Sequence, residues 1–121
     1  MARYRLTRSA KADIASILHT SEERHGREAR IRYAALLLAA LRRVAEEPEG
    51  RSTLDRSELR PGIRSFHIRH SRGESREAAV ANPVHVIFYR GVRPGLVEIV
   101  RVLHDRMEPR RHVGADRQVE G

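Results

Sequence analysis

The fold is decided by one stretch of the sequence, Val84 to Leu103, which reads VHVIFYRGVRPGLVEIVRVL. Its first part, Val84 to Tyr89, is rich in the β-branched and aromatic residues that are enriched in strands. Its last part, Leu96 to Leu103, is almost continuously apolar, as expected of a strand in the middle of a sheet. Between them, Gly91 to Gly95 holds the glycines and the proline that form turns. The stretch therefore predicts two strands of one sheet joined by a turn.

A third strand is predicted upstream, over Ile63 to Arg69, where side chains of different character alternate between two faces. The polar segment Arg51 to Gly62 precedes it and ends in a Pro-Gly turn signal. The segment His70 to Pro83 is polar and long for a connection between neighbouring strands. We expect it to be an extended surface loop with one helical turn around Glu77 to Val80.

The first half of the chain predicts a short strand followed by two helices. The strand covers Arg3 to Leu6, where polar and apolar residues alternate. Apolar residues then recur at helical spacing from Ala10, and Gly26 is the expected stop. A second helix is predicted over Glu28 to Glu47, because its apolar residues form a continuous stripe that ends before a proline and a glycine. Helices joined by so short a break fold back on each other as a hairpin.

The predicted order is therefore β-α-α-β-β-β, an α+β fold in which a helix hairpin packs on one face of a small, mostly antiparallel sheet. The chain of 121 residues has room for one core. We expect a single domain over residues 1–112, followed by a flexible tail over residues 113–121.

Composition restricts the class of protein further. The formal net charge is +8, and Lys11 is the only lysine, so nearly all of the positive charge is arginine. Arginine presents a flat cation that suits carboxylates and phosphates, so we expect an acidic partner. The chain has no cysteine, which excludes disulfides and thiolate metal sites and favours a reducing cytoplasm. We expect neither a membrane span nor a secretion signal, because no apolar stretch is long enough.

Three strings along this pattern resemble the RelE/ParE toxin family. They are Ser57 to Phe66 (SELRPGIRSF), Val86 to Arg90 (VIFYR) and Glu98 to Glu108 (EIVRVLHDRME), and the last is most similar to the ParE branch. They occur in the family's order, and the similarity extends from about Arg3 to His112. The long loop after Arg69 departs from the family, because compact members turn tightly there.

The resemblance implies the toxin of a type II toxin–antitoxin system. ParE-type members poison DNA gyrase by stabilising its cleaved DNA complex, with no chemistry and no cofactor of their own. A ParD-like antitoxin with an acidic or amphipathic tail neutralises them. One alternative is a RelE-like endonuclease that cuts mRNA on the ribosome. A second is a degenerate, non-toxic member that binds only its antitoxin and acts as a co-repressor.

A ribonuclease needs a base, an acid and cations gathered at one point. The candidates are Arg64, Arg101 and His104, with Glu58 as a further base. RelE-like sites also use lysine or tyrosine near the end of the chain, and no tyrosine follows Tyr89. The structural alternatives are that His104 caps the sheet and that Arg101 pairs with Glu98 or with a helix carboxylate, because a buried charge needs a partner.

Contacts with the target and with the antitoxin are expected from two sets of residues. The target-binding candidates follow the last strand or lie near its end: Arg101, His104, Arg106, Met107, Arg110 and Arg111. The antitoxin-binding candidates come from the over-wide stripe of the second helix and from the sheet: Ile31, Ala34, Ala35, Leu38, Arg64, Phe66 and Arg90. The wide stripe is also compatible with helix pairing or a homodimer.

Two other kinds of site are not expected. His67 and His70 have a metal-like spacing, but residues three apart on a strand face opposite sides, so we expect no metal site. The basic tail lacks interleaved aromatic residues, and aromatics are only 4% of the chain. Any direct contact with nucleic acid is therefore expected to be weak or indirect.

Overall fold

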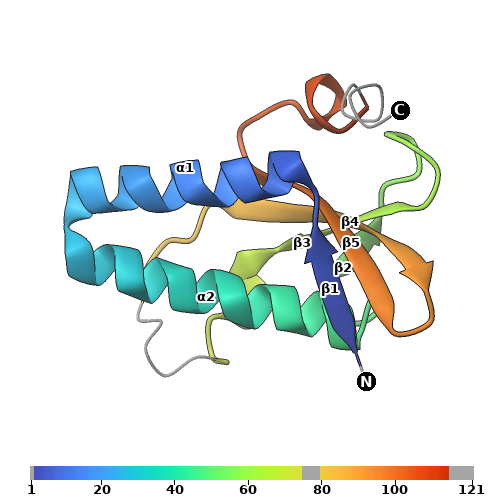
Figure 1. The fold of residues 1–121 in the computed structure, drawn as a ribbon, viewed down its shortest axis with the longest axis horizontal. Helices are drawn as coiled ribbons and strands as arrows, with labels where there is room; N and C mark the ends of the chain where they lie inside the picture. The colour runs from blue at the N-terminus through green and yellow to red at the C-terminus, as the bar shows by residue number, and fades with distance from the viewer. Residues whose placement is uncertain (1, 75–79, 115–121) are drawn as a thin grey trace.

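A computed structural model describes residues 2–74 and 80–114 of the chain. Within these residues, two long helices and five strands make up the fold (Figure 1). In chain order they are β1 (Arg3–Leu6), α1 (Arg8–His25), α2 (Arg27–Glu46), β2 (Thr53–Asp55), β3 (Ile63–His67), β4 (His85–Arg93) and β5 (Leu96–His104). Two short 3-10 helices follow β3 and β5, η1 (Ile68–Ser71) and η2 (Pro109–Arg111).

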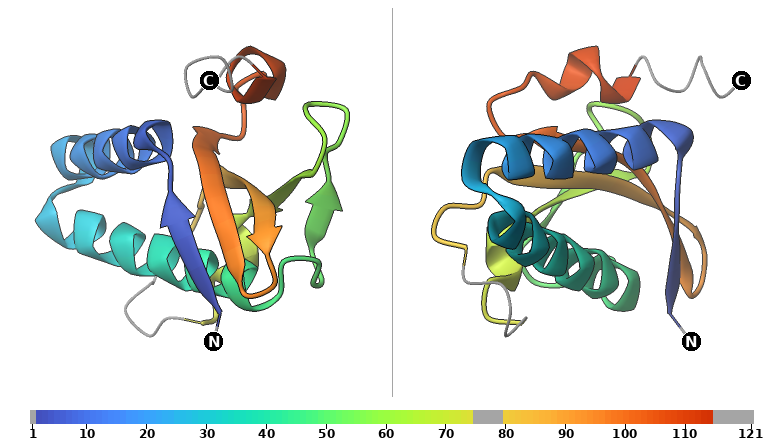
Figure 2. Two further views of the ribbon diagram at one scale, coloured as in Figure 1. Left: turned by 45° about the vertical axis from the view of Figure 1, so that its right-hand side comes forward. Right: turned by 60° about the vertical axis from the view of Figure 1, so that its left-hand side comes forward.

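The strands form one sheet in the order β1-β5-β4-β3-β2. Strand β1 is parallel to β5, with Arg3 opposite Leu96 and Leu6 opposite Ile99, and the other neighbouring pairs are antiparallel. The helix hairpin lies on one face of this sheet, which both views of Figure 2 show. The α+β fold with a helix hairpin on a mostly antiparallel sheet is thus confirmed.

The helix hairpin turns at Gly26. This residue ends α1 and begins α2 with a φ of 93°, a value that only glycine adopts without strain. At the other end of α1, the Thr7 hydroxyl oxygen accepts a hydrogen bond from the Ala10 N–H at 3.0 Å. Thr7 is therefore the N-cap, and both helices lie within two residues of their predicted bounds.

Strand β2 was not predicted, and the segment Arg51 to Gly62 is not a plain connection. The sequence of β2, Thr-Leu-Asp, has no alternation of apolar residues that would mark a strand. It becomes a strand by pairing with β3, where Thr53 lies opposite Phe66. The edge position explains why so polar a segment suffices, since it buries little.

Two other strand predictions need correction. Strand β3 ends at His67 instead of Arg69, because the Nδ1 of His67 accepts the N–H of Arg69 at 3.1 Å and starts η1. Strand β4 continues to Arg93, so the turn before β5 consists of only two residues, with Gly95 at a φ of 83°. Residues 77–79, most of the predicted helical turn, lie outside the described residues.

The main core lies between the helices and the sheet. Helix α2 supplies Leu36, Leu37, Ala40, Leu41 and Val44, and the sheet supplies Phe66, Ile87, Tyr89, Val97, Ile99 and Val102. A smaller cluster on the opposite face consists of Ile63, Phe88, Val100, Leu103 and Val113. Val113 is fully buried, so packing extends one residue past the expected domain boundary, whereas residues 115–121 lie outside the described part.

A β-bulge in β5 connects this sheet to α1. Phe88 of β4 lies opposite Arg101 but Tyr89 lies opposite Ile99, so Val100 is an extra residue. The Thr7 hydroxyl donates a hydrogen bond to the Val100 carbonyl at 2.8 Å. Just beyond, the Asp13 carboxylate of α1 accepts the Val102 N–H at 2.9 Å. The side chains of Thr7 and Asp13 thus bind backbone groups of β5 beside and beyond the bulge.

Arg101 completes this connection. Its Nε and Nη2 donate to the two carboxylate oxygens of Asp13, each at 2.8 Å. Both side chains are largely buried, with 19% of Arg101 and 13% of Asp13 exposed. Among the sequence-based alternatives for Arg101, the helix carboxylate is confirmed.

We expect Asp13→Ala to lower the free energy of unfolding by about 2–4 kcal/mol, because it leaves a buried guanidinium and a backbone N–H without their acceptor. Urea denaturation of the purified variant measures the change. Glu22→Ala is the matched control, since it removes a carboxylate of α1 whose partner is Arg30 and whose side chain is 44% exposed. That control should lose less than about 1 kcal/mol. Equal losses for the two variants would contradict a special role for Asp13.

Candidate functional site

A groove lies at the end of the helix hairpin where α1 joins α2. It has a volume of about 760 Å³, within the size range of ligand sites. Its walls come from α1, α2 and the segment that leads into β4, which passes beside the hairpin in Figure 1. Among its lining residues are Ile17, Arg24, Arg32, Tyr33, His85 and His104.

The polar side of the groove is organised by Tyr33. Its hydroxyl oxygen accepts the Val84 N–H at 3.1 Å and lies 2.7 Å from the Nδ1 of His85. Because the backbone N–H occupies one acceptor position, the hydroxyl proton is assigned to the bond with His85. His85 then carries its own proton on Nε2. Neither residue was singled out from the sequence as a site residue, because they lie far apart in the chain and Tyr33 fits the core stripe of α2.

His85 is uncharged at neutral pH. Burial, together with the smaller effect of the neighbouring His104, lowers the pKa of His85 to about 4. The rings of His85 and His104 lie edge to face, with centroids 5.6 Å apart. Burial also raises the pKa of the Tyr33 hydroxyl. Tyr33 and His85 therefore give the groove a polar surface that carries no charge at neutral pH.

His104 belongs both to this groove and to the end of the sheet. Its Nδ1 accepts the Arg106 N–H at 3.1 Å, as expected of a histidine that caps a strand. The next residue, Asp105, accepts a hydrogen bond from the Nε2 of His67 at 2.9 Å, and this bond lowers the pKa of the Asp105 carboxyl. The ends of β3 and β5 are thus joined by side chains.

The residues proposed for a nuclease do not lie together. Arg64 lies opposite Tyr89 of β4 and donates to the Thr53 hydroxyl, whereas His104 lies opposite His85. Their partners on β4, Tyr89 and His85, are four residues apart, which along a strand corresponds to about 13 Å. Arg101, between them, is held by Asp13. A phosphate could not contact all three side chains at once.

The fourth nuclease candidate, Glu58, lies on the loop between β2 and β3. Its carboxylate accepts a hydrogen bond from Arg56 Nε at 2.8 Å. This bond lowers the pKa of Glu58, which makes the carboxylate a weaker base.

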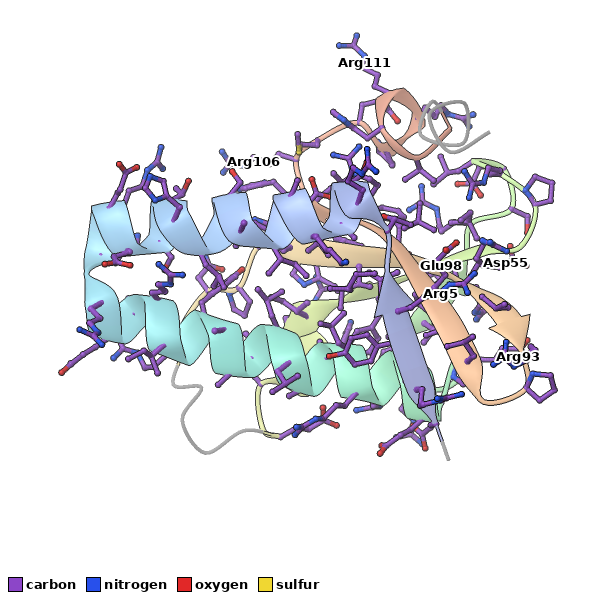
Figure 3. All side chains as sticks on the ribbon, viewed as in Figure 1. Arg5, Asp55, Arg93, Glu98, Arg106 and Arg111 are labelled. Carbon is purple, nitrogen blue, oxygen red and sulfur yellow. The ribbon has the colours of Figure 1, made fainter. Side chains whose placement is uncertain are left out.

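The target-binding candidates separate into two groups. Arg106, Met107, Arg110 and Arg111 follow β5 on the surface, and 43% of Met107 is exposed. Figure 3 shows Arg106 and Arg111 reaching outward at the same edge of the molecule. Arg101 instead points to α1, and His104 lines the groove. Of the six target-binding candidates, those that follow β5 form an exposed basic segment.

The antitoxin-binding candidates are also divided. Ile31 and Leu38 on α2 are exposed at 53% and 40%, and Ala34 and Ala35 between them are partly buried. Phe66, in contrast, is 1% exposed and contributes to the core. The two remaining candidates, Arg64 and Arg90, lie on the sheet.

Arg90 forms an ion pair with Glu98 at 2.9 Å, and Arg5 pairs with the same carboxylate at 3.2 Å. Arg90 follows the buried Tyr89 of the helix side, so it faces the opposite side of the sheet, where Figure 3 shows Arg5 and Glu98. The exposed stripe of α2 and Arg90 therefore belong to different surfaces.

Residues 2–74 and 80–114 contain neither a metal-binding cluster nor a helix that could span a membrane. This part of the chain holds no group of three or more His, Asp or Glu side chains placed to bind a metal ion. Its helices lack the combination of length and apolar character needed to cross a membrane. His67 and His70 do not share a strand, because His70 belongs to η1.

Comparisons with known proteins agree with this fold. The model of the family described as ParE toxin of the type II toxin–antitoxin system parDE matches residues 4–109. The chain is 42% identical to Toxin ParE1 of Caulobacter vibrioides over 115 residues, which cover 94% of this chain and all of the relative. It is 31% identical to Toxin ParE1 of Mycobacterium tuberculosis, covering 93% and 98% of the two chains.

A solved structure shares the fold. A chain of the chromosomal ParDE TA system from P. aeruginosa superimposes with a TM-score of 0.60. The match covers 86% of this chain and 96% of that chain, at 17% identity.

Because His85 is neutral in the folded protein, we expect the free energy of unfolding to fall at acidic pH. Its folded-state pKa of about 4 lies below the unfolded value of 6.5, so the unfolded chain binds the proton more readily between these values. The contribution of His85 to the free energy of unfolding is then fully present above about pH 6.5. It falls by about 2 kcal/mol as the pH decreases from 7 to 4.5. Urea denaturation at several pH values should show a shallower decline for His85→Gln. His19→Gln, at a side chain that is 71% exposed, should decline like the wild type.

Proposed function

Because the chain belongs to the ParE toxin family of type II toxin–antitoxin systems, we propose that it arrests growth by stabilising the cleaved DNA complex of DNA gyrase. The toxin acts by binding, without a catalytic residue or a cofactor of its own. A ParD-like antitoxin neutralises it, and both chains work in the cytoplasm.

The observation that carries the proposal is the extent of the family match. The match starts at Tyr4 in β1 and ends at Pro109, the first residue of η2, so it includes residues of every described strand and of both long helices. The curated relative from Caulobacter vibrioides is covered over its full length, which leaves no domain of that relative unmatched.

The geometry is consistent with a toxin that binds rather than cuts. Arg64 and His104 lie at different levels of the sheet, and Arg101 is held by Asp13. The exposed segment after β5, with Arg106, Arg110 and Arg111, is the best candidate for contact with gyrase or with the DNA that gyrase holds. The RelE-like alternative would need the three nuclease candidates at one point.

Supercoiled plasmid incubated with gyrase and purified toxin should accumulate cleaved, protein-linked DNA, and the antitoxin added first should prevent this. Agarose electrophoresis after proteinase treatment measures the cleaved fraction. Charge reversal at Arg110 and Arg111 should reduce that fraction several-fold, because attraction to an acidic target is lost. Reversal at Arg27 and Arg42, two exposed arginines of the hairpin, is the control.

Expression of the toxin in growing cells separates the gyrase poison, the mRNA endonuclease and the co-repressor. Growth arrest by folded toxin with no cleaved DNA would overturn the gyrase proposal and direct attention to mRNA cut on ribosomes. The His104→Ala variant should still arrest growth if the toxin acts by binding, and should not if His104 is a catalytic acid or base. No arrest at all, from a chain that still binds its antitoxin, would indicate the co-repressor.

A further inference from the structure

The groove at the end of the helix hairpin is lined by cations but by no carboxylate. The chain has 16 Asp and Glu residues, yet none of them is among the described residues that line the groove. Arg24, in the last turn of α1, and Arg32, in the second turn of α2, both line it. Within the described residues neither guanidinium has an ion-pair partner, whereas Arg30 nearby pairs with Glu22. Two guanidinium groups without partners at one groove favour an anionic ligand.

Hydroxyl groups of α1 add neutral donors to these cations. Ser16, Thr20 and Ser21 all line the groove. Ser21 and Arg24 are three positions apart, so they lie on the same face of the helix. A phosphoryl group offers three acceptor oxygens and about two negative charges, more than a carboxylate does. The combination of hydroxyls with two arginines therefore favours a phosphate over a carboxylate.

The floor of the groove, formed by Tyr33, His85 and His104, contributes ring N–H donors. The Nδ1 of His85 lies 2.7 Å from the Tyr33 hydroxyl, and the Nδ1 of His104 accepts the Arg106 N–H at 3.1 Å. Each of these two histidine rings therefore carries a proton on Nε2. Such N–H groups donate to the nitrogen and oxygen acceptors of an uncharged ligand group.

Apolar side chains from three segments also line the groove. They are Ile17 of α1, Ala29 of α2, and Val80 and Val84 of the segment before β4. The volume of about 760 Å³ is that of a site for a small organic ligand. An apolar wall beside ring N–H donors suits a flat heteroaromatic ring such as a nucleobase, which buries its faces and presents acceptors at its edge.

We propose that this groove binds a small phosphorylated ligand of the size and chemistry of a mononucleotide. The phosphoryl group pairs with Arg24 and Arg32. The heteroaromatic ring packs against Ile17 and accepts hydrogen bonds from His85 and His104. This binding activity goes beyond the proposed action on gyrase and does not depend on it.

Isothermal titration calorimetry of the full-length toxin measures the Kd for the 5′-monophosphates of adenosine, guanosine, cytidine and uridine, each titrated separately. At least one nucleotide should bind with a Kd of about 10–100 µM, an ordinary affinity for a ligand of this size. The matching nucleoside, which lacks the phosphoryl group, should bind at least about 10-fold more weakly, and so should inorganic phosphate, which lacks the ring.

A double variant tests the two cations of the groove. Arg24→Gln/Arg32→Gln should raise the Kd of the best nucleotide at least about 10-fold, because the charge-assisted bonds to the phosphoryl group are lost. Arg27→Gln/Arg42→Gln is the matched control, since it makes the same charge change at exposed positions of the hairpin outside the groove. That control should change the Kd less than about 3-fold.

A second variant fills the groove without changing its charge. Ala29→Trp places a large side chain at a partly buried position that lines the groove, and it should also raise the Kd at least about 10-fold. Ala12→Trp, at an exposed position of α1 outside the groove, is its control and should bind like the wild type. Circular dichroism and the Tm establish that each variant is folded.

The wild type alone supplies a measurement that needs no variant. The imidazole NMR signals of His85 and His104 should move as the nucleotide is added, because both rings line the groove. The signals of His19, whose side chain is 71% exposed and lies outside the groove, should not move.

Several outcomes would overturn the nucleotide site. A Kd above about 1 mM for every nucleotide would do so, as would equal affinity for a nucleotide and its nucleoside. Inorganic phosphate that binds as tightly as the best nucleotide would indicate an anion site without a pocket for the ring. Equal losses in the groove and control variants, or unmoved signals of His85 and His104, would place the ligand elsewhere. None of these outcomes bears on gyrase, because the titrations contain the toxin alone.

Discussion

The carboxylate of Asp13 fixes the position of the helix hairpin on the sheet. It accepts two bonds from Arg101 and one from the Val102 N–H, just after the bulge at Val100. Because of the extra residue at Val100, Ile99 and Val102 both face the core on the helix side although they are three positions apart. Thr7 provides the second connection, because one hydroxyl both caps α1 and binds the Val100 carbonyl. Helix α1 buries so little apolar surface that these polar contacts must define where it lies.

The groove is a consequence of this arrangement. The hairpin is anchored at the beginning of α1, near the bulge, while its far end reaches beyond the core to Gly26. Among the described residues, the groove there is lined by the two helices, the segment before β4 and the ends of the central strands. Tyr33 connects these parts through Val84 and His85. The fold therefore creates a polar floor beneath apolar walls without devoting a separate element to it.

Periodicity in the sequence was enough to predict both helices, the central strands and the overall order, because each of these elements buries one regular face. It did not predict β2, whose Thr53 to Asp55 become a strand only by pairing with β3. For Arg101 it predicted a carboxylate partner but left Glu98 and the helices as alternatives, because its actual partner, Asp13, lies 88 positions away in the chain. Tyr33 and His85 were missed as a pair, since their contact spans 52 positions of the chain and neither lies in a local motif.

The pairing of β1 with β5 also sets the order of events during synthesis. The first strand of the chain has its hydrogen-bonding partner in the last strand, and the Thr7 hydroxyl needs the carbonyl of Val100. A ribosome adds roughly 5–20 residues each second, so α1 and α2 emerge seconds before β5 exists. The hairpin has local contacts and forms early, whereas closing the sheet requires contacts between the two ends of the domain. The sheet, and the surface that it carries, is therefore finished only after β5 has left the ribosome, although the hairpin that covers it is made first.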